Sequence, residues 1–289
     1  MSASMPRHGM APGSGGADPS PRVRQGTSSP AGAERTTRLA AWETTRSHDK
    51  LGTTLGERSG AATLEAPTSA GVTVVARAPV RLSFGGGGTD LPAYSDRFGG
   101  LVVSAAVTRF ATAVASPSAD GGIGVNSADY RTWRRWPAGD RPDDGEPLSL
   151  PRATLAWFAE HGLLPHGVDL FTASEAPPGS GLGSSSAMAV AIVGALAGYS
   201  GLDVDAASAA ALACEVEIGR LGRPIGRQDQ YAAAVGGVNA IAFEPSGEVL
   251  VEPLALTPGT LAGLNEGLLL LSTGSTRDSA SILSGQRAR

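Results

Sequence analysis

The sequence predicts an α+β fold, and two observations indicate it. Runs of β-branched and apolar residues, typical of strands, occupy 72–84 and 101–115, whereas Ala-rich runs typical of helices follow residue 187. These segments do not alternate in a regular βαβ pattern, so a doubly wound parallel sheet is not expected. Of the 289 residues, 41% are hydrophobic, which is enough apolar material for a substantial core.

The first 70 residues differ in composition from the rest. Residues 1–70 are rich in Ser, Thr, Gly, Ala, Pro and Arg and contain few aliphatic side chains. Such a segment cannot bury enough apolar surface to offset its loss of chain entropy. We expect a disordered low-complexity leader, which is either a regulatory tail or a stretch upstream of the true start of translation.

Order is expected from residue 71 onward. Apolar and β-branched composition predicts strands at 72–78 and 80–84, a long buried strand at 101–115, and one or two strands within 123–136. Four successive glycines make 85–90 a loop, because neither a helix nor a strand tolerates them. A polar loop at 141–147 then precedes an amphipathic helix over 151–162, which Gly162 ends.

The C-terminal half begins with a strand near 168–171. We expect a helix over about 188–199, a second helix from a cap at Asp203 or Asp205 to about 217, a break at 219–226, and a short helix at 227–235 ended by two glycines. A strand pair follows at 238–243 and 249–254, then an apolar strand at 267–271 and a helix from 278 to 286.

Charge and residue counts exclude several classes of function. The net charge of −4 favours neither nucleic acid nor an anionic membrane surface as a partner. The single cysteine, Cys214, excludes an internal disulfide and a multi-cysteine zinc site. The four histidines form no metal-binding pattern. The single lysine, Lys50, excludes a P-loop, which needs a lysine beside the phosphates. With no signal peptide or long apolar run, a cytoplasmic location is expected.

A glycine- and serine-rich loop stands where a strand passes into a helix. It runs from Pro177 to Ala187 with the sequence PPGSGLGSSSA. Glycines allow the backbone to approach a ligand closely, and the free N–H groups of the first helical turn attract anions. The alternative interpretation is a tight connection in which a serine caps the helix.

Two further clusters contain residues suited to chemistry. Arg81 precedes the glycine-rich loop that ends at Asp90, and Glu217 precedes a segment that contains Asp229. Taken alone, Asp90 can be a turn cap, and Glu217 and Asp229 can be solvated helix residues.

Together the three stretches resemble one family, the GHMP kinases, which include galactokinase, homoserine kinase and mevalonate kinase. APVR at 78–81 with GGTDL at 87–91 is similar to the family's first motif, and PPGSGLGSSSA to its second. EIGRLGRPIGRQDQ at 217–230 is similar to the segment with a metal-binding Glu and a catalytic Asp. The details are closest to heptose 7-phosphate kinases and their fucokinase-like relatives, and the resemblance covers about 74–286.

The resemblance implies a fold, a reaction and a division of roles. The fold is the α+β GHMP kinase N-terminal domain (ribosomal protein S5 domain 2-like), over 71–262. The reaction is transfer of the γ-phosphate of ATP, with Mg²⁺, to a sugar or sugar-phosphate hydroxyl, best matched by the anomeric hydroxyl of a heptose 7-phosphate. Asp229 is the implied base and Arg81 its partner, and Ser185 and Glu217 are the implied metal ligands. The implied ATP-binding residues are Pro178, Gly179, Ser180, Gly181, Leu182, Gly183, Ser184 and Ser185, and the substrate-binding residues are Gly87, Gly88, Thr89, Asp90, Arg227 and Arg277.

The resemblance also indicates a missing part. Family members carry a second domain with a third glycine-rich motif, and no such stretch follows Gly274. We therefore expect 263–289 to be the start of a truncated C-terminal domain. A catalytically impaired fragment, acting as a nucleotide-binding or partner-dependent module, is the alternative function, and a homodimer is left open.

Two other enzyme classes fit less well. A dinucleotide-binding protein would use the glycines of 179–183 with Asp203 or Asp205, but the intervening residues indicate a helix where that fingerprint needs a second strand. A serine hydrolase lacks the Gly-x-Ser-x-Gly motif and a suitable histidine.

Overall fold

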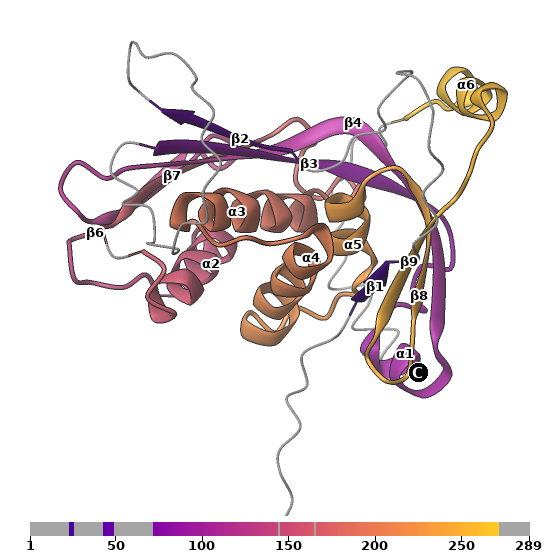
Figure 1. The fold of residues 1–289 in the computed structure, drawn as a ribbon, viewed down its shortest axis with the longest axis horizontal. Coiled ribbons are helices and arrows are strands. Elements are labelled where there is room, and N and C mark those ends of the chain that lie inside the picture. The colour runs from indigo at the N-terminus through magenta and orange to yellow at the C-terminus, as the bar shows by residue number, and fades with distance from the viewer. Residues whose placement is uncertain (1–22, 26–42, 49–71, 144, 165, 272–289) are drawn as a thin grey trace, which may run out of the picture.

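A nine-stranded mixed sheet forms the frame of the protein (Figure 1). The computed structural model describes residues 23–25, 43–48, 72–143, 145–164 and 166–271. The strands are β1 (Val23–Gln25), β2 (Glu43–His48), β3 (Val72–Gly85), β4 (Gly100–Ser116), β5 (Ile123–Ser127), β6 (Thr132–Trp136), β7 (Val168–Ser174), β8 (Val238–Phe243) and β9 (Val249–Pro253).

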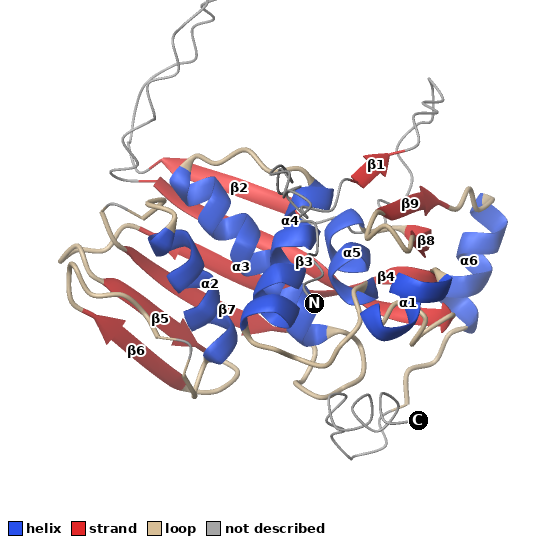
Figure 2. Ribbon diagram, turned by 90° about the horizontal axis from the view of Figure 1, so that it is seen from below, coloured by secondary structure: helices blue, strands red, loops and turns tan. Residues whose placement is uncertain are grey.

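The helices are α1 (Pro92–Phe98), α2 (Ser149–Glu160), α3 (Ser184–Ser200), α4 (Ala206–Cys214), the π-helical segment η1 (Glu215–Arg220), α5 (Gln228–Val235) and α6 (Pro258–Gly267). Helices α2 to α5 cover one face of the sheet, as Figure 2 shows from the helical side, whereas α6 lies apart from them in Figure 1 and has no buried residue. Among the described strands, only β1 with β9 and β5 with β7 pair in parallel. The α+β prediction is therefore confirmed, and most predicted elements occur within a few residues of their expected bounds.

Strand β4 connects the two halves of the sheet. Its first residues pair with β8 and its last with β7, while β3 pairs along its other edge. The register between β3 and β4 shifts between Pro79 and Val80. Proline has no N–H to donate to a ladder, so an irregularity at this position is expected.

Helix α3 is the centre of the core. Nearly all of its residues are buried, including Ala189, Ile192 and Leu196, and it packs against β3 and β4, with α2, α4 and α5 around it. A helix that is apolar on all sides must be enclosed, as this one is. The facing strand residues are also small, among them Ala76 and Ala113, which lets helix and sheet approach closely.

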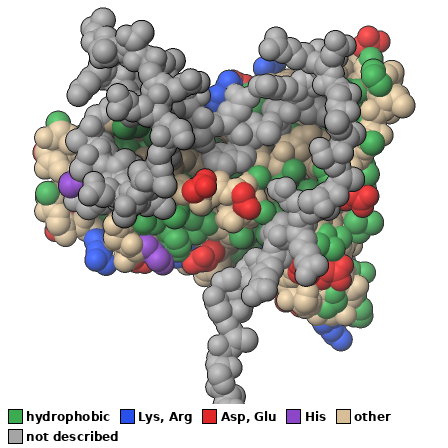
Figure 3. All heavy atoms as spheres, in the orientation of Figure 1, with side chains coloured by type: hydrophobic (Ala, Val, Ile, Leu, Met, Phe, Trp, Pro, Cys, Tyr) green, Lys and Arg blue, Asp and Glu red, His purple; other side chains and the backbone are tan. Residues whose placement is uncertain are grey.

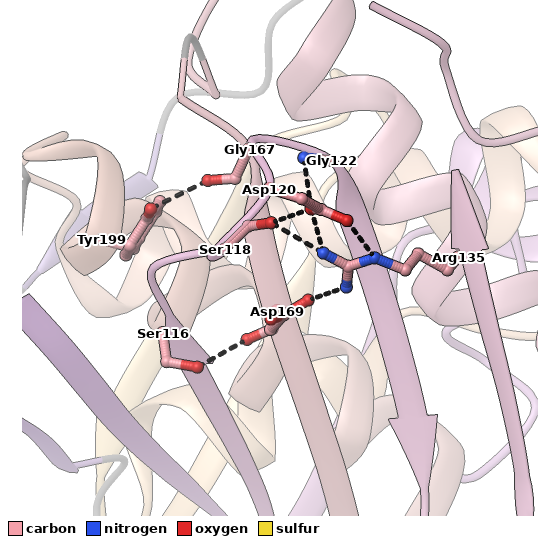
Figure 4. Close-up of polar contacts among 8 residues, drawn as sticks. All are labelled: Ser116, Ser118, Asp120, Gly122, Arg135, Gly167, Asp169 and Tyr199. Atoms are coloured by element: carbon pink, nitrogen blue, oxygen red, sulfur yellow. Dashed lines mark hydrogen bonds and ion pairs between the residues drawn. The ribbon is translucent and has the colours of Figure 1, made fainter. Parts of the chain in front are cut away.

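An arginine on strand β6 holds the far end of the sheet together (Figure 4). Arg135 donates to the carboxylates of Asp120 and Asp169 and to the hydroxyl of Ser118. The hydrogen bond from Arg135 lowers the pKa of Asp120 well below its usual range. These contacts join β6, β7 and the turn before β5. Nearby on the sheet, Phe171 and Trp133 are exposed.

Two segments of the predicted leader lie in the sheet. Strand β1 pairs with β9 and strand β2 with β3. The expectation of disorder over 1–70 is wrong for these segments, because main-chain pairing along a sheet edge does not require an apolar core. The remainder of 1–70 lies outside the described residues.

The predicted strand at 267–271 is not formed. Helix α6 runs to Gly267, and Leu268 to Leu271 follow it without strand pairing, with Leu269 86% exposed. A strand needs a neighbouring strand for its N–H and C=O groups, and no described strand lies beside this run. The predicted domain boundary at 262/263 falls inside α6, and the predicted helix at 278–286 lies outside the described residues.

One face of the molecule carries mixed side chains. Figure 3 shows acidic, basic and apolar side chains among the coloured atoms of the face that it presents. Within the described ranges, no helix is both long and apolar enough to cross a bilayer.

Cys214, at the end of α4, gives a probe of folding. Its thiol is buried beneath the helices, and burial raises its pKa far above the ordinary value. Because only the thiolate reacts readily, we expect a thiol reagent such as DTNB to label the native protein negligibly and the denatured protein fully. As Cys214 is the only cysteine, rapid stoichiometric labelling of native protein would contradict its placement.

Candidate functional site

The loop between β7 and α3 has the geometry of an anion site. Gly179, Gly181 and Gly183 all adopt positive φ angles, between 72° and 77°, which side-chain-bearing residues rarely adopt. Leu182 is buried and anchors the loop to the core, and its carbonyl accepts the backbone N–H of Arg81 at 2.9 Å. The chain therefore holds the loop in one shape across the start of α3.

No side chain caps the start of α3 in the described structure. The N-cap residue is Gly183, and Ser184 is already the first helical residue. The alternative interpretation of this loop, in which a serine caps the helix, is therefore wrong. The first N–H groups of the helix have no side-chain cap, and the macrodipole adds positive potential there.

Arg81 and Asp229 form a bidentate ion pair beside this loop. The Nε and Nη2 atoms of Arg81 donate to the two carboxylate oxygens of Asp229, both at 2.7 Å. Nη1 of Arg81 donates to the Gly181 carbonyl at 2.8 Å. A Cβ at Gly183 would stand 3.0 Å from the Asp229 carboxylate, so a glycine is needed for this close approach. Arg81 thus joins the carboxylate to the loop.

The environment of Asp229 opposes its ionisation in part. Burial raises the pKa of Asp229, the Arg81 guanidinium lowers it, and the nearby carboxylates of Asp90 and Glu217 raise it again. The net direction is upward. A partly buried carboxylate with a raised pKa, held beside a candidate phosphate loop, is suited to accept a proton.

Ser185 and Glu217 meet on the other side of the loop. Glu217 has no exposed surface, and its Oε1 accepts the Ser185 hydroxyl at 2.8 Å and Nη1 of Arg223 at 2.9 Å. Its Oε2 accepts the amide of Gln230 at 2.7 Å. The serine and glutamate oxygens are hard donors that fit Mg²⁺. No three His, Cys, Asp or Glu residues gather as a metal site among the described residues, so other oxygen ligands would complete the shell.

The π-helical turn η1 places Glu217 inward. It continues directly from α4 and is held to α2 at two points. Trp157 donates to Glu215 at 2.8 Å, and Arg220 makes two hydrogen bonds of 2.7 Å to Glu160. Such π-helical turns occur frequently at functional sites, because they redirect a side chain without ending the helix.

The loop that contains the four glycines is fastened to α5. Asp90 is buried, and its carboxylate accepts the backbone N–H groups of Gly88 at 2.9 Å and Gln228 at 3.0 Å. Thr89 donates its hydroxyl to the Gly86 carbonyl at 2.7 Å. Asp90 therefore holds the first turn of α5, which contains Asp229, and orders the glycine loop at the same time.

A cavity of about 260 Å³ opens beside the glycine- and serine-rich loop 177–187, which we call the Gly-Ser loop. The loop and the start of α3 form one wall through Pro178, Gly179, Ser184 and Ser185, and Arg223 lies at the same wall. The opposite walls come from β5, β7, the turn after β5 and the start of α2, including Asp129, Tyr130, Leu148 and Thr172. Arg152 of α2 fixes the nearby loop by donating to the Asp143 carbonyl at 2.9 Å.

Comparison with known proteins shows which family this arrangement resembles. Residues 149–237 match the family described as GHMP kinases N terminal domain. The matched range spans the Gly-Ser loop, Glu217 and Asp229.

The similar individual proteins are sugar kinases. D-glycero-alpha-D-manno-heptose 7-phosphate kinase of Campylobacter jejuni is 30% identical over 73% of this chain. L-fucokinase/L-fucose-1-P guanylyltransferase of Bacteroides fragilis is 31% identical over 58% of it. The crystal structure of a D-glycero-D-manno-heptose 1-phosphate kinase from Bacteriodes thetaiotaomicron superposes with a TM-score of 0.63 and 32% identity, over 66% of this chain and 62% of that one. This chain spans 62% of the length of the first curated relative and 20% of the second.

The fold does not bring every predicted residue to the site. The guanidinium of Arg227 donates to the Gly247 carbonyl and the Ser95 hydroxyl, both at 3.1 Å, and lies over the ring of Phe243. It joins α1 to the β8–β9 turn, so its prediction as a substrate ligand is not supported by this placement. Arg277 lies outside the described residues.

Three contributors to the site were not predicted from the sequence. Arg223 and Gln230 both contact Glu217, and neither was assigned a role, although both lie within the 217–230 stretch. The helix α1 after the glycine loop was also missed. Arg223 had one usable signal, its position beside Pro224 in a break between two helices.

Proposed function

We propose that this chain binds ATP and transfers its γ-phosphate to a hydroxyl of a sugar or sugar phosphate. The observation that carries the proposal is that the Gly-Ser loop lies between a cavity and the Arg81–Asp229 ion pair. The cavity lies on the side of Ser184 and Ser185, and the Arg81–Asp229 pair lies against Gly183. A phosphate bound at the loop would therefore face a nucleoside pocket on one side and a base on the other.

The residues divide the work of phosphoryl transfer. The backbone of 179–185 would hold the donor phosphates, and Ser185 and Glu217 would hold Mg²⁺. When bound, Mg²⁺ neutralises charge that develops on the phosphates. Asp229 would orient the acceptor hydroxyl and accept its proton. Arg81 keeps Asp229 at the loop and adds positive charge where the phosphoryl group is transferred.

The acceptor would lie between Asp229 and the glycine loop 87–90. Gly87 and Gly88 leave backbone groups open to a sugar, Thr89 and Asp90 shape the loop, and direct contact of Asp90 with a sugar hydroxyl stays a prediction. A heptose 7-phosphate, phosphorylated at its anomeric hydroxyl, is the acceptor that we propose. The names of two of the similar proteins, both heptose phosphate kinases, support this choice. A cytoplasmic location, where ATP and sugar phosphates are found, and a homodimer are part of the proposal.

The test is an assay of ADP formation with a panel of acceptors. Heptose 7-phosphate should give the highest kcat/KM, with fucose and galactose lower, and ³¹P NMR should place the new phosphate on the anomeric oxygen. Absence of ADP formation with every acceptor, although ATP binds, would instead favour a nucleotide-binding module that depends on a partner. The exposed run Leu268–Leu271 is the observation that favours this second function.

Removal of the Ser185 hydroxyl should weaken the metal site. We expect Ser185→Ala to raise the Mg²⁺ concentration for half-maximal activity by about tenfold or more, because even outer-shell partners of metals have effects of this size. Ser200→Ala, at the other end of α3, is the matched control, since its hydroxyl bonds only the Ala197 carbonyl in the described structure. Identical Mg²⁺ titrations of Ser185→Ala and the parent protein would remove Ser185 from the metal shell.

A further inference from the structure

Arg223 contacts both residues that are proposed to hold the metal ion. Its Nη1 atom donates to Oε1 of Glu217 at 2.9 Å and lies 2.5 Å from the hydroxyl oxygen of Ser185. These are the same two oxygen atoms that would ligate Mg²⁺. The guanidinium therefore stands where the divalent charge would be needed.

The buried negative charge of Glu217 explains why the guanidinium of Arg223 lies beside it. The carboxylate is fully buried, and a buried carboxylate without a positive partner is strongly unfavourable. Ser185 and Gln230 provide only neutral hydrogen-bond donors to it. Among the described contacts, Arg223 supplies its only ion pair.

Arg223 can also reach the cavity. Its side chain is 29% exposed and lines the cavity with Ser185 and the Gly-Ser loop. Its backbone is held in place, since its N–H donates to the Glu217 carbonyl at 3.0 Å and its own carbonyl accepts from Ile225 at 2.9 Å. The flexible part is therefore the side chain alone, which extends from a fixed point between the buried carboxylate and the cavity.

We propose that Arg223 is a positioning residue that occupies the metal site in the nucleotide-free protein and exchanges partners when nucleotide binds. In the free protein it holds Glu217 and Ser185 in place. On binding, it releases Glu217 to the divalent cation and pairs with a phosphate of the nucleotide, which suits the forked donor geometry of arginine. The inference rests on the proposed function, because it assumes a nucleotide with a divalent cation.

The first experiment uses Mg²⁺ alone as the probe. In EDTA, Arg223→Gln should lower Tm by several degrees, because Glu217 is left buried and unpaired. Millimolar Mg²⁺ without nucleotide should raise the Tm of this variant toward that of the parent, whose own Tm should change little. If Mg²⁺ raised the Tm of the variant no more than that of the parent, the proposal that Arg223 occupies the metal site would be contradicted.

The second experiment measures ATP binding by calorimetry in EDTA, where no divalent cation is present. Arg223→Gln should raise the Kd for ATP by about tenfold, the loss expected for one charge-assisted hydrogen bond. Arg223→Lys keeps the positive charge but loses the two parallel N–H donors of the guanidinium, so its Kd for ATP should lie between those of the parent and Arg223→Gln. An unchanged Kd for ATP in Arg223→Gln would contradict the transfer of Arg223 from Glu217 to a phosphate. Arg223 would then serve only as a structural partner of Glu217.

Two further variants make both results decisive. Arg134→Gln makes the same chemical change at an exposed arginine of β6, which donates to the Trp133 carbonyl, and it should change neither the Mg²⁺ response nor ATP affinity. If Arg223→Gln does not fold, the double variant Glu217→Gln with Arg223→Gln removes the buried charge and carries the ATP measurement. If the parent protein binds no ATP in either condition, the proposed function fails, while the Mg²⁺ experiment still tests the shared site.

Discussion

Asp229→Asn should lower kcat by about 10²–10⁴-fold, the range for loss of a general base, while the Kd for ATP stays close to that of the parent. The amide is the same size as the carboxylate but cannot accept the proton of the acceptor hydroxyl. Arg81 keeps its contact with the Gly181 carbonyl, so the phosphate loop should retain its shape. Steady-state kinetics and calorimetric ATP binding measure the two quantities separately.

The control for this substitution is Asp203→Asn, which makes the same chemical change at an exposed position before α4. It should leave kcat and ATP affinity unchanged. If Asp229→Asn instead kept near-normal turnover, Asp229 would not be the base. If it lost ATP binding as strongly as turnover, its role would be to shape the loop rather than to transfer a proton.

Gly226→Ala should be strongly destabilising for a single methyl group. A Cβ at this position would overlap the carboxylate of Asp90, which is buried and fixed by its hydrogen bonds to Gly88 and Gln228. Forced repacking of this kind costs about 1–3 kcal/mol. Displacing Asp90 would also release the start of α5, so we expect loss of activity together with a Tm lower by several degrees.

Gly219→Ala provides the comparison for this prediction. Gly219 lies in η1, and the nearest atom to an added Cβ is Cγ of Glu215 at 3.9 Å, an ordinary contact. This change should leave Tm unchanged or slightly raised, since alanine favours a helix over glycine. Equal Tm values for the two variants, measured by thermal denaturation, would show that the Asp90 carboxylate is free to move aside.

The sequence predicted the parts of the fold whose cause is local. The strands at 101–115 and 238–243 and the helix through Ile192 follow from composition and periodicity, and the structure contains them. The run Leu268–Leu271 has the same composition as a buried strand, yet it is exposed. Composition does not tell whether a pairing partner is present, and in the described residues none lies beside it.

Only those site residues that lie in recognisable sequence motifs could be predicted. Arg81, Asp229 and Glu217 were singled out as residues suited to chemistry, and a family resemblance implied their roles. The structure brings them around the Gly-Ser loop. The contacts of Arg223 and Arg227 depend on where long side chains turn after the backbone is in place. Both arginines lie in one short segment, yet they point to different partners, and no sequence pattern distinguishes them.

The single strand β4 has a consequence for cooperativity. It forms hydrogen bonds with β8 at one end and with β7 at the other, so both halves of the sheet depend on the same strand. We therefore expect that loss of β4 itself would release both halves of the sheet, because each half pairs with a different stretch of this strand. The rigidity that positions Arg81, on the neighbouring strand β3, thus belongs to the domain as a whole.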